Sequence, residues 1–204
     1  MTAGQRFVRV VTTIVVRRPA LWRLFRGRMT RNFDKLAPEW DATRVSPERL
    51  LPIAAALDAL PTPPERVLDL GTGSGRVARL AAERFAGAEV TGADVSAEMV
   101  REAERLAATE REHYLRADAS DLPFPDGAFD LVTLNNMIPF FDELARVVEP
   151  GGHAAVAFSL GPSTPIWVPL ERVRDELEAR GFAHIADFSA GPGVALLARK
   201  TQPS

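Results

Sequence analysis

An aspartate followed by closely spaced glycines is the strongest sign of a binding site in this chain. Residues 67–75 read Val-Leu-Asp-Leu-Gly-Thr-Gly-Ser-Gly, which places Asp69 among apolar residues and glycine at 71, 73 and 75. The apolar residues are typical of a buried parallel strand. The glycines favour a tight turn in which the backbone approaches a ligand. A helix that begins near Arg76 would point its first amide groups at the same ligand.

The glycine spacing excludes the two common phosphate-binding turns. A dinucleotide fingerprint has the form G-x-G-x-x-G, and neither Gly71 nor Gly73 begins such a series. The Gly-Lys-Ser/Thr of a phosphate-binding loop is absent as well. The Asp69 carboxylate would repel a diphosphate but suit an ammonium group. We therefore expect a ligand with a positive amine and a ribose; an ordinary glycine-rich turn is the alternative.

A second carboxylate, Asp94, ends the next short apolar run. It follows Val-Thr-Gly-Ala at 90–93 and lies 19 residues after Gly75, near the spacing of about 20 at which such folds place an acid on ribose hydroxyls. Ser96 can cap a helix over 97–108. We expect Asp94 to bind a ribose, and an acid in a plain strand-to-helix loop is the alternative.

Several segments in the right order resemble the class I S-adenosylmethionine-dependent methyltransferases, in particular the methyltransferase type 11 group. The matching segments are 67–75, Asp94, 116–132 and 142–152. In addition, residues 32–41 resemble the stretch that helps to cover the cofactor in quinone-biosynthesis and related methyltransferases. The resemblance implies S-adenosylmethionine as cofactor, with S-adenosylhomocysteine as product.

The resemblance also implies the cofactor-binding residues. Asp69 and the backbone of 71–75 would hold the methionyl part, and Asp94 would bind the ribose hydroxyls. Asp118 would accept a hydrogen bond from the adenine amino group, and Asn135 would lie near the sulfonium. The complete expected set is Asp69, Gly71, Thr72, Gly73, Gly75, Asp94, Val95, Met99, Asp118, Ala119 and Asn135.

The catalytic residues are left open by the sequence. Many relatives carry histidines after the fourth strand, whereas this chain has Asn135-Asn136 there. The three histidines of the chain are scattered, so no metal site is predicted. His153, for example, is more typical of a strand residue than of a catalyst. The candidates for the surroundings of the methyl group are Trp40, Asn135, Asn136 and Phe140.

The alternation of patterns predicts an α/β fold with a Rossmann-like, doubly wound, mostly parallel sheet of seven strands and helices on both faces. The expected strands are 66–70, 89–94, 113–117, 129–134, 153–159, 183–188 and 194–199. The expected helices are 46–60, 74–86, 96–108, 140–148 and 168–180. The short link 189–193 predicts an antiparallel hairpin at the C-terminal edge.

Composition and charge set limits on the partners. The chain has 204 residues, no cysteine and a formal net charge of −2, which predicts a single cytoplasmic domain without disulfides and gives no general case for nucleic acid. The charge is uneven, because residues 1–33 contain eight arginines and no acid. Subtracting this +8 from the total of −2 leaves −10 for residues 34–204.

Residues 1–45 are predicted to form a basic amphipathic helical arm, or lid, ahead of a methyltransferase domain at 46–200. Apolar residues recur at helical spacing on both sides of Pro19, namely Phe7, Val10, Val11, Ile14, Val15, then Leu21, Leu24, Phe25, Met29 and Phe33. The apolar run from 8 to 16 is too short to span a bilayer. Packing on the domain or on a second subunit is the favoured role of the arm, ahead of peripheral contact with an anionic membrane.

The sequence thus predicts a methyltransferase that acts on a small acceptor, with a hydrophobic one favoured. The alternatives are a membrane-associated quinone or lipid methyltransferase and a catalytically silent cofactor-binding module. The accepting atom, the general base and the oligomeric state, with a homodimer as one option, are left open.

Overall fold

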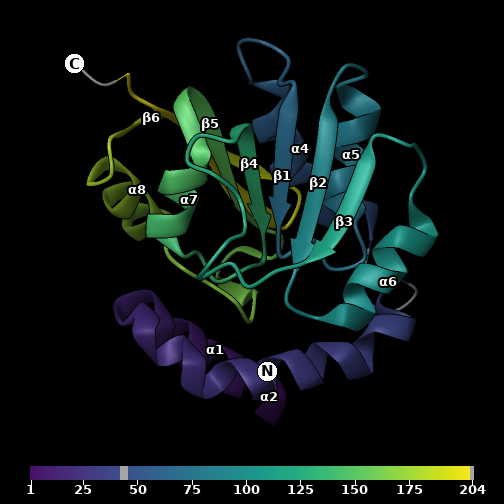
Figure 1. Cartoon of the computed structure of the whole chain (residues 1–204). Helices are drawn as coiled ribbons and strands as arrows, with labels where there is room; N and C mark the ends of the chain where they lie inside the picture. The colour runs from purple at the N-terminus through teal and green to yellow at the C-terminus, as the bar shows by residue number, and fades with distance from the viewer. Residues whose placement is uncertain (42–45, 203–204) are drawn as a thin grey trace.

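A computed structural model describes residues 1–41 and 46–202 and shows a seven-stranded sheet in the order β3-β2-β1-β4-β5-β7-β6 (Figure 1). All neighbouring strands are parallel except β7, which is antiparallel to both β5 and β6. The predicted fold class and the C-terminal hairpin are therefore confirmed. The strands are β1 (Arg66–Leu70), β2 (Glu89–Asp94), β3 (Glu112–Arg116), β4 (Phe129–Asn135), β5 (Val148–Phe158), β6 (Phe182–Ala190) and β7 (Gly193–Lys200).

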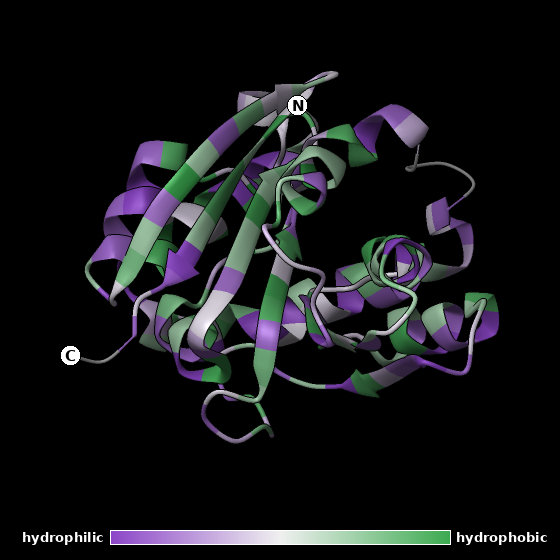
Figure 2. Ribbon diagram, turned by 90° about the horizontal axis from the view of Figure 1, so that it is seen from above, coloured by the Kyte–Doolittle hydropathy of each residue, from purple (hydrophilic) through white to green (hydrophobic). Residues whose placement is uncertain are grey.

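Helices cover both faces of the sheet and bury the two sets of alternating strand residues. Along β1, Leu68 contributes to the core beneath α7 (Phe141–Val147) and α8 (Leu170–Glu178), whereas Val67 packs with α4 (Leu51–Asp58) and α5 (Arg76–Arg84). This separation follows from the two-residue period of a strand. A further helix, α6 (Ala97–Leu106), packs beside β2 and β3. Figure 2 shows green and purple residues on each helix, as expected for amphipathic elements between a core and water.

The N-terminal arm consists of α1 (Ala3–Arg17), the 3₁₀ turn η1 (Pro19–Leu21), α2 (Trp22–Leu36) and the 3₁₀ turn η2 (Ala37–Glu39). Figure 1 shows the arm lying across the end of the sheet where the parallel strands finish. Its inner side chains form a separate apolar cluster with Ile138, Phe140 and Ile166 of the body. Packing of the arm on its own domain is thus confirmed.

Two apolar residues of the arm depart from the prediction. Val10 is 56% exposed and Leu24 is 68% exposed, although both belong to the apolar residues that recur at helical spacing. A helix turns by about 100° per residue. Val10 therefore points to a different side of α1 from its neighbour Val11, which is completely buried.

Some boundaries also differ from the predicted ones. The helix expected over 46–60 is divided into the 3₁₀ turn η3 (Pro47–Leu50) and α4. Strand β5 begins at Val148, but its register against β4 shifts before His153, where regular pairing starts. A short 3₁₀ turn, η4 (Gly161–Ser163), follows β5. The predicted domain boundary at residue 45 lies outside the described residues. No described helix has the length and apolar character needed to cross a membrane.

Candidate cofactor and acceptor site

A cavity of about 810 Å³ lies between the carboxyl ends of the strands and the inner side of the arm. Because parallel strands end at the same edge of the sheet, residues that are distant in sequence meet there. Gly75 is the one expected cofactor residue that does not line the cavity. The expected residues that do line it are Asp69, Gly71, Thr72, Gly73, Asp94, Val95, Met99, Asp118, Ala119 and Asn135, together with Trp40, Asn136 and Phe140.

The glycine turn after β1 depends on backbone conformation more than on the approach of a ligand. All three glycines have left-handed φ angles between +55° and +82°. A Cβ atom added at Gly75 would lie 2.7 Å from the Tyr114 hydroxyl, so Gly75 is required by the packing of the protein itself. A Cβ atom added at Gly73 would have Trp40 Nε1 as its nearest neighbour, at 3.9 Å. Of the three glycines, Gly73 alone leaves room for a further atom beside the cavity. Packing within the protein therefore accounts for Gly75, and the approach of a ligand to the backbone at this turn stays a prediction.

Asp69, one residue before the end of β1, is a buried carboxylate. The hydroxyls of Thr72 and Thr133 donate to it at 2.7 and 2.8 Å, and the side chain is 2% exposed. Burial raises the pKa of Asp69 to about 6, although both hydrogen bonds oppose the rise. The contact of Thr133 with Asp69 was not predicted from the sequence, because Thr133 belongs to a distant strand, β4. Only the pairing of β1 with β4, which sets Asp69 opposite Thr133, reveals the contact.

Asp94 fastens the glycine turn to the end of β2. Its carboxylate accepts the amide of Gly73 at 3.0 Å and the amide of Ser96 at 2.9 Å. Burial raises the pKa of Asp94, against the effect of these hydrogen bonds. A carboxylate offers about four acceptor positions, so Asp94 retains capacity for the hydroxyls of a ribose.

Asp118 is bound by the arm as well as by its own loop. Trp22 Nε1 donates at 2.9 Å and Arg26 Nη1 at 2.7 Å, while the amide and hydroxyl of Ser120 donate from within the loop. Burial raises the pKa of Asp118, but the hydrogen bonds from Arg26, Ser120 and Trp22 outweigh it, so the pKa is lowered. An adenine amino group would have to share an acceptor that already holds four donors. No local pattern in the sequence indicates this arrangement, because Trp22 and Arg26 lie more than ninety positions away from Asp118.

Asn135 ends β4 and Asn136 follows it. The two side chains differ in whether their polar atoms have hydrogen-bond partners. Asn136 has φ of +58° and uses both ends of its side chain on Ser159, with the Nδ2 atom donating at 2.9 Å and the Oδ1 atom accepting at 2.8 Å. Its place in the cavity wall is thus structural. In contrast, Asn135 Oδ1 is buried without any hydrogen-bond partner among the described residues. This free acceptor in the cavity wall suits a ligand that carries a hydrogen-bond donor.

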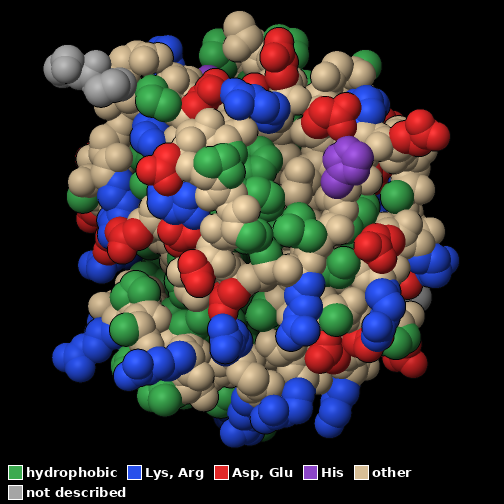
Figure 3. Space-filling view, in the orientation of Figure 1, with side chains coloured by type: hydrophobic (Ala, Val, Ile, Leu, Met, Phe, Trp, Pro, Cys, Tyr) green, Lys and Arg blue, Asp and Glu red, His purple; other side chains and the backbone are tan. Residues whose placement is uncertain are grey.

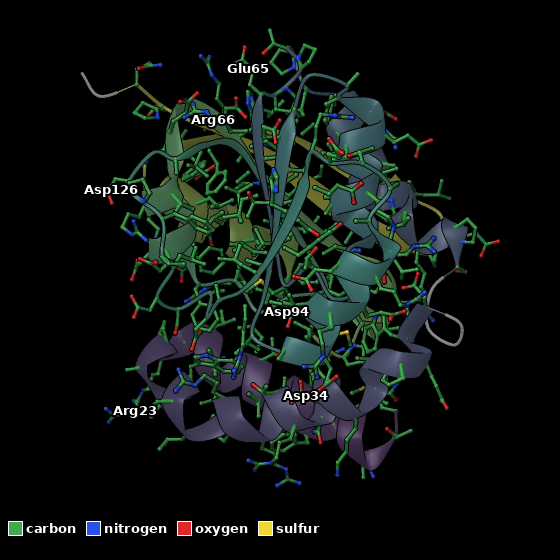
Figure 4. The ribbon with its side chains drawn as sticks, turned by 45° about the vertical axis from the view of Figure 1, so that its right-hand side comes forward. Arg23, Asp34, Glu65, Arg66, Asp94 and Asp126 are labelled. Carbon is green, nitrogen blue, oxygen red and sulfur yellow. The ribbon has the colours of Figure 1, made fainter. Side chains whose placement is uncertain are left out.

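The arm is linked to the turns that surround the cavity at two further points. Ser96 Oγ donates to Asp34 at 2.6 Å, and Figure 4 shows Asp34 on α2 facing the region of Asp94. Asp41 accepts a hydrogen bond from Ser74 Oγ and lies 3.5 Å from Arg79 Nη2. Polar contacts therefore fasten the arm to the turns that follow β1 and β2.

The part of the cavity beneath the arm is apolar and aromatic. Trp22 stacks edge-to-face on Phe140 with ring centroids 5.6 Å apart, and Phe33 meets Trp40 in the same manner at 5.9 Å. Met29, Leu36, Met137 and Ile138 complete this lining. His153 and the other two histidines do not line the cavity, and no cluster that could hold a metal ion occurs among residues 1–41 and 46–202.

Comparisons with known proteins agree with this arrangement. Residues 67–152 match a family described as a methyltransferase domain. A demethylmenaquinone methyltransferase from Thermus thermophilus is 41% identical over 61% of this chain and 62% of its own length, and a malonyl-[acyl-carrier protein] O-methyltransferase from Pseudescherichia vulneris is 42% identical over 47% and 39%. The chain thus spans about three fifths or less of the length of the curated relatives that it matches.

Solved structures extend the likeness to most of the chain. A Haloferax volcanii putative methyltransferase, solved in complex with the Trm112 methyltransferase activator, superposes with a TM-score of 0.71 at 21% identity, over 83% of this chain and 98% of its own. At this identity the likeness establishes the fold alone. Taken together, residues 67–152 match a methyltransferase-domain family, the chain has the class I methyltransferase fold, and its resemblance to the S-adenosylmethionine-dependent methyltransferases is confirmed.

Proposed function

We propose that this chain transfers a methyl group from S-adenosylmethionine to a small apolar acceptor bound beneath the arm. The observation that carries the proposal is the division of one cavity into two parts. Carboxylates and a free amide oxygen line the end formed by the strands, and aromatic side chains line the end formed by the arm. Such a division suits a polar cofactor beside an apolar second substrate.

The polar end fits the chemistry of S-adenosylmethionine. Asp69 is a buried carboxylate whose hydrogen-bond donors are two threonines, with no cation from the described residues among them. An ammonium group beside Asp69 would offset its cost of burial, and Asn135 Oδ1 could accept a hydrogen bond from the same group. Asp94 has acceptor capacity for a ribose. Bound there, the cofactor would supply a methyl group on a positively charged sulfur and leave as S-adenosylhomocysteine.

The apolar end favours a flat hydrophobic acceptor. Two aromatic pairs and several aliphatic side chains face this space, and rings stack well on such surfaces. The relatives named as demethylmenaquinone methyltransferases support a quinone-like ring as the acceptor. A malonyl-thioester acceptor, as in the name of the other relatives, would meet fewer polar partners at this end.

The residues around the cavity contribute alignment more than proton transfer. No histidine lines it, so we expect an acceptor that becomes nucleophilic by its own ionisation and releases its proton to water. Holding the two reactants in line can contribute up to roughly 7–11 kcal/mol in favourable cases. We assign this positioning to the arm (residues 1–45) and to the end of β4, acting on a methyltransferase domain at 46–200.

The test is incubation of the purified chain with methyl-labelled S-adenosylmethionine and either a demethylmenaquinone or a fractionated cell extract. We expect label in an organic-soluble product, and less product from the Asp94→Ala variant when S-adenosylmethionine is limiting. If calorimetry detects no binding of S-adenosylhomocysteine, the proposal fails completely. If the cofactor binds but no fraction gains label, the chain is a silent cofactor-binding module, an outcome that the fold alone allows. Label that appears only in water-soluble products would refute the apolar acceptor.

A further inference from the structure

The side of the arm that faces away from the cavity carries a repeating basic and apolar pattern. On α1, exposed residues follow a four-three-four spacing, which keeps them on one side of a helix; they are Arg6, Val10, Thr13 and Arg17. The exposed residues of α2 with the same spacing are Leu24, Arg28 and Arg31; Lys35 continues the spacing but lines the cavity and is not counted here. We call these two rows, with Arg23 beside them, the outer face of the arm. Each row contains one exposed aliphatic residue among cations.

The two rows lie next to each other. The guanidinium of Arg28 on α2 sits 4.2 Å from the ring centroid of Phe7 on α1, so the helices run side by side. Figure 3 shows blue side chains gathered along the lower edge of the molecule, over these helices, with hydrophobic side chains between them. In Figure 4, Arg23 projects outward from the same side. The outer face is therefore one continuous surface.

The arginines of the outer face have no acidic partner among the described residues, although Arg28 lies over the Phe7 ring. Among the arginines of the arm, Arg26 is paired with Asp118, and Arg9 donates to backbone carbonyls of 162–165. By contrast, no acidic side chain of the described residues lies within 4.0 Å of the outer-face arginines Arg6, Arg17, Arg23, Arg28 and Arg31. Residues 34–204 carry a formal −10 in total. An anionic surface would thus attract the arm and repel the body, which orients the molecule.

We propose that the outer face docks on an anionic lipid surface. Val10 and Leu24 are 56% and 68% exposed, and aliphatic side chains between arginines are typical of helices that lie in a membrane interface. A single-stranded nucleic acid would favour exposed rings for stacking, but Trp22 is only 7% exposed and Arg28 lies over Phe7. A duplex could use the arginines through its phosphates, but it gives no reason for Val10 and Leu24 to point outward. An acidic protein could use the arginines, but it gives no reason for the two aliphatic residues to point outward.

This docking would place the cavity close to lipid. The inner side of the same helices lines the cavity through Val8, Met29 and Phe33, and a helix with its side chains is about 10–12 Å across. An apolar acceptor dissolved in the membrane would then be held within about one helix diameter of the site. The docking itself does not depend on the proposed methyl transfer, because it concerns binding to lipid alone.

The test is co-sedimentation of the full chain with vesicles of phosphatidylcholine, with or without phosphatidylglycerol. We expect sedimentation only with phosphatidylglycerol, and its loss at high salt. One variant replaces four outer-face arginines with glutamine (Arg6, Arg17, Arg23 and Arg31). The partition coefficient should fall about fivefold for each lost charge, and so by a hundredfold or more in total. The variant Val10→Ser/Leu24→Ser should lose roughly tenfold.

A matched control removes the same number of charges from the body. It replaces the exposed residues Arg66, Arg101, Arg105 and Arg172 with glutamine and should sediment as the wild type does, with all variants checked for unchanged thermal unfolding. Equal loss in this control would show a nonspecific charge effect and overturn the proposal. Equal binding to neutral vesicles would also overturn it. If the serine variant binds as the wild type does while the arginine variant loses binding, the attraction is purely electrostatic and Val10 and Leu24 do not enter the lipid, which overturns docking in the membrane interface.

Discussion

Replacing Asp69 with asparagine should stabilise the cofactor-free protein while removing its ability to bind the cofactor. The pKa of this carboxyl is about 6 in the folded chain and 3.8 without burial. That difference corresponds to a cost of about 3 kcal/mol for holding the charge in the folded state at pH 7. Asparagine carries no charge and can still accept one hydrogen bond from Thr72 or Thr133. Since it cannot replace both hydrogen bonds equally well, we regard about 3 kcal/mol as the upper limit of the gain.

The direction in which stability changes with pH follows from proton binding by Asp69. Between pH 3.8 and about 6, folded Asp69 retains a proton that the unfolded chain has released. Its contribution to the free energy of unfolding therefore falls as the pH rises through this window and stays low above it. For a chain of this size, each kcal/mol changes Tm by roughly 2–4 °C. The Asp69→Asn variant should thus melt up to about 10 °C above the wild type at pH 7 and show a smaller gain at pH 4.

The assay is thermal unfolding of both proteins over this pH range, together with calorimetric binding of S-adenosylhomocysteine. Asp58→Asn is a suitable control, because the Asp58 side chain is 62% exposed and its loss should matter little. A lower Tm for Asp69→Asn than for the wild type at pH 7 would refute the reasoning. It would mean that the hydrogen bonds from Thr72 and Thr133 outweigh the desolvation of the charge.

Four further predictions concern the same region. Calorimetry should show S-adenosylhomocysteine binding to the wild type weaken about tenfold between pH 7 and pH 5, because an ammonium group requires ionised Asp69. Asp94→Ala should weaken that binding by about 1–3 kcal/mol, and unchanged affinity would remove Asp94 from the site. Gly75→Ala should lower the unfolding free energy by about 1–3 kcal/mol, since it strains φ and collides with Tyr114; chemical denaturation would measure this. Asp41→Ala should raise KM for the acceptor more than Kd for the cofactor, and equal changes in both would argue against an acceptor lid.

The order of the strands and helices was predictable because each carries its signal locally. The alternation of apolar runs and amphipathic stretches fixes where an element forms, and the turn residues fix where it ends. The positions of Asp69 and Asp94 at strand ends follow from the same patterns. Because parallel strands finish at one edge, even the meeting of these carboxylates in one cavity could be expected before the structure was known.

The contacts that give those carboxylates their properties were decided by the tertiary structure. Thr133 meets Asp69 only because β4 pairs with β1, and Trp22 reaches Asp118 only because the arm folds across the sheet. The side of the arm that faces water was also decided there, with Val10 exposed and Val11 buried. A sequence pattern records the period of a helix, whereas the direction of its apolar side and the partners of a buried charge depend on which surfaces pack together across long separations in the chain.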